Sequence, residues 1–107
     1  MTSDSIDWAT GRVSFWGLER VDERAPLLEQ SSELREDLAQ VRYPNAVVLD
    51  VGFYPAFSDR GSFVVSVVQA DDWDAPLFKQ HGQTIDSLFD ALRRAVNAAV
   101  SASSLRP

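Results

Sequence analysis

The sequence contains no cysteine and only one histidine, His81. The missing cysteines exclude disulfide scaffolds, thiolate nucleophiles, iron–sulfur clusters and most structural zinc sites. A single histidine also excludes metal centres built from several histidines. We therefore expect no metal site and no cofactor, and a fold that depends on its apolar core alone.

Long apolar runs are missing as well. No stretch approaches the roughly 20 apolar residues that span a bilayer, and residues 1–5 (MTSDS) do not begin a secretion signal. We expect a soluble, cytoplasmic protein. Basic residues are in the minority, at ten against sixteen acidic ones, which gives a formal net charge of −6. This charge repels nucleic acid and anionic membranes and favours a basic partner.

Length and composition fit one folded domain. The 107 residues are 45% apolar and 24% charged, which is ordinary for a globular chain and leaves little room for a second domain. We expect residues 1–107 to form a single domain. Residues 1–10 and 103–107 are expected to be loose tails.

The first half of the chain contains one predicted helix, from Asp22 to Arg42. Large apolar residues recur there at the three- and four-residue spacings of an amphipathic helix: Leu27, Leu28, Leu34, Leu38 and Val41. A shorter helix that starts at Ser31 or Ser32 is an alternative. Residues 12–18 fit either a short strand or an irregular segment.

The second half contains three predicted strands. Side chains alternate in character over residues 46–54 and 62–70, which predicts two strands joined by a hairpin connection at residues 55–61. A third strand is expected at residues 76–80, and His81 is expected to lie in the turn that follows.

The last predicted element is a helix from Ile85 to about Ala102, capped by Thr84 and marked by a continuous apolar stripe. Together the elements predict a two-layer α+β fold, in which the N-terminal and C-terminal helices pack on one face of a three-stranded antiparallel meander. The opposite sheet face, with Asp50, Tyr54 and Ser66, is expected to stay accessible.

Sequence motifs of common enzymes are missing. The chain has no GxSxG, P-loop, GxGxxG or HExxH pattern, so we expect that it is not an enzyme and has no catalytic residues. A small enzyme or ligand-binding domain is an alternative. It would need a closed pocket that contains His81 and a carboxylate.

The loop after the second strand contains the strongest candidate for partner binding. Trp73 stands among Asp71, Asp72 and Asp74. Tryptophan offers a large, stiff contact area, and carboxylates can pair bidentately with arginine. Two simpler readings remain open, because the loop can be a solvated turn and Trp73 can fold back into the core. The loop lacks the glycine and the distal glutamate of an EF-hand calcium site.

A second candidate group lies on the outer strand face and the hairpin tip, namely Asp50, Tyr54, Phe57 and Asp59. Phe57 either covers the core from the side or is exposed as an anchor. Five acidic residues and one arginine lie between positions 43 and 74, so negative charge concentrates around these loops. We expect both candidate groups to bind a cationic protein partner.

Residues 50–55 (DVGFYP) are followed by an apolar strand, by residues 72–77 (DWDAPL) and by an amphipathic helix. Over residues 43–100 this arrangement resembles small acidic immunity proteins that are encoded beside bacterial polymorphic or contact-dependent toxins. The resemblance implies a cytoplasmic, non-enzymatic protein that binds one cognate toxin domain and blocks its active site. Independently, the acidic charge favours a basic toxin domain, such as a nuclease with a groove built for phosphate. The alternative is an acidic secretion chaperone or adaptor, which would dimerise and hold an effector segment.

Overall fold

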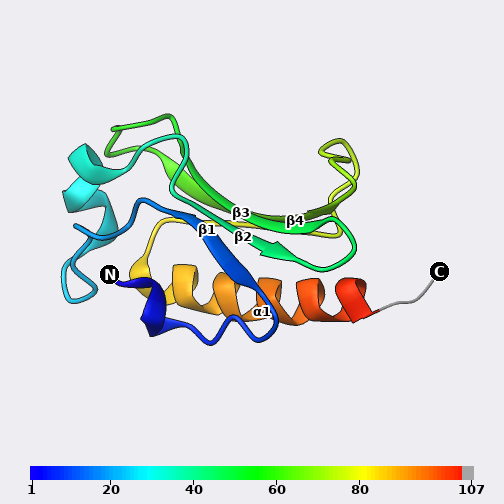
Figure 1. The fold of residues 1–107 in the computed structure, drawn as a ribbon. Helices are drawn as coiled ribbons and strands as arrows, with labels where there is room; N and C mark the ends of the chain where they lie inside the picture. The colour runs from blue at the N-terminus through cyan, green and yellow to red at the C-terminus, as the bar shows by residue number, and fades with distance from the viewer. Residues whose placement is uncertain (105–107) are drawn as a thin grey trace.

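The computed structural model describes residues 1–104, in which five strands form one antiparallel sheet. Each strand pairs with its neighbour in sequence, so the sheet is a meander, and one long helix, α1, runs beneath it (Figure 1). The α+β prediction is confirmed, but the sheet has five strands instead of three. The strands are β1 (Arg12–Trp16), β2 (Ala39–Tyr43), β3 (Val47–Tyr54), β4 (Ser62–Gln69) and β5 (Phe78–Gly82), and α1 covers Ile85–Ser104.

The core lies between α1 and the two central strands. The alternation in β3 and β4 sends every second side chain toward the helix, so that Phe53 pairs with Phe63 and Val51 with Val65, all of them fully buried. The apolar stripe of α1 covers them with buried side chains that include Leu88, Leu92, Ala95 and Ala99. The central hairpin and the last helix were therefore predicted nearly at their observed bounds.

Thr84 starts α1 as predicted. The backbone N–H of Ser87 donates to Thr84 Oγ1 at 3.1 Å, which is the bond that an N-cap provides. The helix continues through Ser104, so the expectation of a loose tail is wrong for residues 103 and 104. The side-chain amide of Asn45 donates to the carbonyl of Ser103 at 2.6 Å and holds this end of the helix. Residues 105–107 of that predicted tail lie outside the described residues.

The predicted N-terminal helix at residues 22–42 is wrong. This segment contains a short 3-10 helix, η2 (Leu27–Glu33), followed by β2, in which buried and more exposed residues alternate. Leu27, Leu34 and Leu38 are buried as expected, but they reach the core from the 3-10 helix and the loop after it. Their spacing matches one face of a helix, but each of these leucines is buried through a separate contact of the 3-10 helix or the loop with the core.

Of the ambiguous residues 12–18, Arg12–Trp16 form β1. Its pairing with β2 shifts between Val13 and Phe15, as at a β-bulge. The shift explains why Ser14 and Phe15 are both exposed while Val13 and Trp16, on either side of them, pack against the core.

The prediction of a loose tail at residues 1–10 is also wrong. Met1, Ile6 and Trp8 are buried in the core cluster. The indole N–H of Trp16 donates to the Met1 carbonyl at 2.9 Å, and the rings of Trp8 and Trp16 meet edge to face at 5.8 Å. The few large apolar residues of this segment cover the β1 end of the core, so burial holds the segment in place.

Tyr43, at the end of β2, has the one buried side-chain polar atom in residues 1–104 without a hydrogen-bond partner. Burial, reinforced by the charge of Asp7, raises the pKa of Tyr43 from 10.0 to about 12. We expect Tyr43→Phe to raise the free energy of unfolding by about 1 kcal/mol at pH 7, because it removes an unsatisfied hydroxyl. Denaturant titration measures this change, and a less stable variant would contradict it.

The same substitution has a predictable pH dependence. The pKa in the folded state exceeds that in the unfolded state, so the contribution of neutral Tyr43 is complete below pH 10 and is lost as the pH rises toward 12. Between these values the wild type should lose stability that Tyr43→Phe keeps. The stability gap between the two proteins should therefore widen with pH.

Candidate functional site on the open face of the sheet

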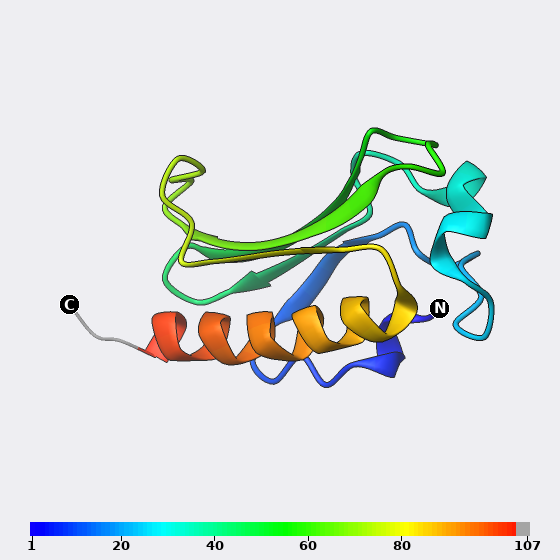
Figure 2. The ribbon, with the colours of Figure 1, turned by 180° about the vertical axis from the view of Figure 1, so that it is seen from behind.

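The sheet face opposite α1 is not covered by any other element of the described chain (Figures 1 and 2). We call it the open face. The β3–β4 loop (residues 55–61) and the β4–β5 loop (residues 70–77) both rise on this side, at opposite ends of the curved sheet. The open face is therefore the floor of a trough with a loop at each end.

The strand registers place one residue from each strand in a single row across this floor. Antiparallel pairing aligns Phe15 with Gln40, Gln40 with Asp50, Asp50 with Ser66, and Ser66 with Lys79. The row combines an aromatic ring, an amide, a carboxylate, a hydroxyl and an ammonium group.

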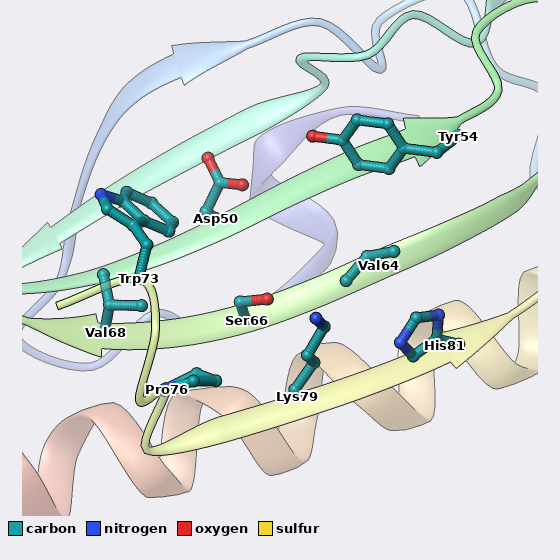
Figure 3. Close-up of a pocket in the computed structure, with 9 residues that line it drawn as sticks. All are labelled: Asp50, Tyr54, Val64, Ser66, Val68, Trp73, Pro76, Lys79 and His81. Carbon is teal, nitrogen blue, oxygen red and sulfur yellow. The ribbon is translucent and has the colours of Figure 1, made fainter. Parts of the chain in front are cut away.

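A hollow of about 410 Å³ lies on the floor of the trough. Trp73, from the β4–β5 loop, and Tyr54, from the end of β3, lie toward opposite ends of this hollow, with Asp50 between them (Figure 3). A smaller hollow of about 280 Å³ adjoins it at Asp50 and reaches Phe15. The larger hollow is lined by Asp50, Tyr54, Val64, Ser66, Val68, Trp73, Pro76, Lys79 and His81.

Gly52 determines how Tyr54 lies. A Cβ atom on Gly52 would stand 2.8 Å from Tyr54 Cε2 and 2.4 Å from the backbone oxygen of Glu36. The tyrosine ring therefore occupies the space that any other residue at position 52 would fill, and its hydroxyl points along the strand toward Asp50 (Figure 3). Burial, and then the charges of Asp50, Glu36 and Asp37, raise the pKa of Tyr54, so its hydroxyl is a neutral donor at pH 7.

Asp50 is a half-buried acid without a salt bridge. Among residues 1–104, the ion pairs are Asp22 with Arg24 and Asp90 with Arg94. Burial raises the pKa of Asp50 above its usual 3.8, the charge of Asp37 adds to this effect, and a hydrogen bond from Gln40 opposes it. Because the folded pKa is raised, the protonated form stabilises the fold at low pH, and this contribution is lost as the pH rises through the folded pKa. Ionised Asp50 thus costs stability at neutral pH, as perturbed acids at functional sites commonly do.

Three of the residues predicted to bind a partner, Asp50, Tyr54 and Trp73, meet in this hollow. Trp73 is 49% exposed and Phe57 is 56% exposed, so neither ring folds back into the core. Phe57 lies in the β3–β4 loop with a positive φ of 60°, and its N–H donates to the carbonyl of Leu34 at 2.8 Å. It stands at the opposite end of the trough from Trp73.

The remaining predicted acids frame the trough and do not form one patch. Asp71, Asp72 and Asp74 are exposed on the β4–β5 loop, and Asp59 is exposed on the β3–β4 loop beside exposed Arg60. Asp72 also lines a separate hollow with Leu77, beside the β4–β5 loop. Net negative charge therefore stands at the β4–β5 end of the open face, whereas Arg60 offsets Asp59 at the other end.

The sequence interpretation missed Lys79 and His81. The third strand was expected at residues 76–80, but it begins at Phe78, because Pro76 has no N–H to donate to a ladder. His81 is therefore a strand residue on the open face and not part of a turn. The alternation along β4 was the available signal, because it places Ser66 on the open face and register then places Lys79 beside it.

The positions of His81 and the acidic side chains bear on the enzymatic and metal-binding alternatives. His81 and Asp50 line the same hollow, but β4 lies between their strands and no hydrogen bond joins them. In the described part of the chain, no group of three or more His, Asp or Glu side chains is arranged to hold a metal ion. None of the helices in this part has both the length and the apolar character needed to cross a bilayer.

Comparison with protein-family models, with curated proteins and with solved structures finds no match to this chain.

Proposed function

We propose that the protein is an immunity-type inhibitor that docks a cognate toxin domain on its open face and blocks the active site or substrate groove of the toxin. The observation that carries this proposal is the exposure of three aromatic rings on an uncovered sheet face. Phe15, Tyr54 and Trp73 are 44–49% exposed. Exposed apolar rings rimmed by polar groups are typical of protein interfaces, and tryptophan and tyrosine are common binding hot spots.

The charge distribution supports a basic partner. The chain has a formal net charge of −6, and exposed acids stand on both loops that frame the trough. A cytoplasmic toxin domain with a basic substrate groove, such as a nuclease, would be attracted to this surface from a distance. Inhibition in this proposal is steric and electrostatic and requires no chemical reaction in the inhibitor.

A secretion chaperone or adaptor is the second candidate. The observation in its favour is the trough itself, whose apolar residues Val64, Val68 and Pro76 could hold an extended segment of an effector. Chaperones of this kind work as dimers, so solution mass separates the two candidates. We expect a monomer that forms a one-to-one complex with the toxin domain.

The direct test is co-expression with the toxin domain encoded by the adjacent reading frame. We expect the protein to protect cells from this domain and to co-purify with it. Loss of viability during co-expression, together with separate elution of the two proteins, would contradict the proposal.

Charge reversal on the β4–β5 loop tests the electrostatic part. We expect Asp72→Lys together with Asp74→Lys to slow association about tenfold at low salt and to weaken its salt dependence, because exposed charges steer the encounter of two proteins. Stopped-flow mixing at two ionic strengths measures both effects.

The matched control for this experiment is Asp4→Lys together with Asp7→Lys, which makes the same change of net charge at exposed positions of the N-terminal segment, away from both loops. This control should associate nearly as fast as the wild type. Equal slowing in the two double variants would mean that net charge matters and that the loop does not.

A further inference from the structure

We propose that the hollow between Trp73 and Tyr54 is a binding site for one arginine side chain of the partner, whose guanidinium group pairs with Asp50 and packs against the two rings. This inference rests on the proposed function and specifies the group that the open face recognises. It follows from the arrangement of two aromatic rings around a carboxylate that accepts a hydrogen bond from Gln40 but has no cationic partner within residues 1–104.

Asp50 supplies the charge. Its side chain is half-buried on the floor of the hollow, and no ion pair within residues 1–104 includes it. A buried carboxylate without a cation is unfavourable, so a site of this kind gains most from a cation that arrives with the partner. Asp37 lines the adjoining hollow and adds negative charge on the same side.

The two rings select the type of cation. Trp73 and Tyr54 approach the hollow from its two ends, on either side of Asp50 (Figure 3). A guanidinium group is planar and weakly hydrated, stacks on aromatic faces and binds carboxylates through two parallel hydrogen bonds. An ammonium group is compact and strongly hydrated, so it would lose more hydration on entering the hollow and would stack less well on the two rings. The neutral Tyr54 hydroxyl points toward the same side of the hollow as Asp50.

Lys79 determines which side of the hollow the arginine occupies. This lysine comes from β5, two strands from Asp50, which corresponds to about 10 Å between the backbones. Its ammonium group repels a cation over β5, so the guanidinium group is confined to the β3 side. It also favours an acidic or neutral partner group next to the arginine.

Short peptides provide the test with the full chain. The probes are N-acetyl-Gly-Arg-Gly-amide and the same peptide with citrulline, which keeps the shape of arginine and removes its charge. We expect the arginine peptide to shift the indole N–H signal of Trp73 in NMR spectra with a dissociation constant on the order of 10 mM. The citrulline peptide should bind at least tenfold more weakly. Equal binding of the two peptides, or no shift with arginine, overturns the inference.

Two variants with opposite expected effects exclude a merely structural explanation. Asp50→Asn should weaken binding of the arginine peptide at least tenfold. The change removes a half-buried charge, so the variant should melt no lower than the wild type at pH 7. Lys79→Met should strengthen binding about twofold, because it removes a repulsive charge from the lining of the same hollow. Asp4→Asn is the matched control at an exposed acid on the N-terminal 3-10 helix η1 (Ser3–Ser5), away from the hollow, and should change nothing. Weakening in both Asp50→Asn and Asp4→Asn would overturn the inference.

The peptide test and the toxin test can fail separately. If Trp73 contributes to toxin binding but the peptides bind alike, the docking face stands and the arginine site is wrong. If the peptides behave as expected but the adjacent toxin domain does not bind, the arginine site stands and the immunity function is wrong.

Discussion

Gly52→Ala is expected to lower the free energy of unfolding by about 3 kcal/mol and to displace the Tyr54 ring. The new methyl group would lie 2.4 Å from the backbone oxygen of Glu36, and backbone atoms cannot yield as the end of a flexible side chain can. A shift of the backbone to relieve this contact would also strain two backbone hydrogen bonds. One runs from Phe53 N–H to the Glu36 carbonyl at 3.3 Å and the other from Leu38 N–H to the Val51 carbonyl at 2.9 Å.

Chemical denaturation measures the loss of stability, and the ring signals of Tyr54 in NMR spectra measure the displacement. The matched control is Val64→Ala, at the residue that pairs with Gly52 across β3 and β4. This control removes volume from the open face instead of adding it, so we expect a loss of about 1 kcal/mol. If Gly52→Ala is as stable as the wild type, the close packing of Tyr54 over Gly52 is not required for the fold.

Trp73→Ala is expected to raise the rate of dissociation from the toxin domain about 30-fold or more, which corresponds to about 2 kcal/mol. The indole ring is half-exposed in the free protein and lines the hollow that the partner is proposed to fill. Association should change little, because Asp71, Asp72 and Asp74 remain to steer the encounter. Surface plasmon resonance with the immobilised toxin domain separates the two rates.

Leu77→Ala is the matched control for Trp73→Ala. Leu77 belongs to the same loop and is 50% exposed, but it lines the hollow beside the loop and not the one on the open face. We expect its dissociation rate to stay within about threefold of the wild type. If both variants dissociate like the wild type, the toxin does not dock on the open face.

The parts of the fold that follow from sequence are those in which one periodicity runs without interruption. Alternation along residues 47–54 and 62–69 predicted the central hairpin, and the stripe of α1 predicted the helix that covers it. Both patterns are local, so the neighbouring residues alone reveal which face is buried.

The parts that failed depend on contacts between distant residues. Leu27, Leu34 and Leu38 have helical spacing, but their burial comes from separate contacts of a 3-10 helix and a loop with the core. The sequence predicts a loose tail at residues 1–10, because burial of Met1, Ile6 and Trp8 requires the edge of a sheet that local sequence does not predict. Tertiary contacts override local propensity in both segments.

Part of the candidate site likewise follows from local sequence, and part does not. Asp50, Tyr54 and Trp73 are predicted as site residues because they lie on or beside strands in which the two faces alternate regularly. The sequence prediction ends the third strand at residue 80, whereas β5 continues through Gly82, so it places His81 in a turn. Lys79 lies within the predicted strand, but only the register with β4 places it beside Ser66. Phe15 and Gln40 are not predicted as site residues because the sequence predicts a helix where β2 lies, and without β2 the floor of the trough has no second half.

The alternation of β3 has an evolutionary consequence. Val47, Leu49, Val51 and Phe53 face the helix, while Val48, Asp50 and Tyr54 face the trough, so core packing and the chemistry of the open face are encoded by different residues of one strand. Mutations at the trough-facing positions can accumulate without opening cavities in the core, with Gly52 as the exception. A lineage with this scaffold can therefore remodel its open face by replacing a handful of surface side chains while its folding determinants stay fixed.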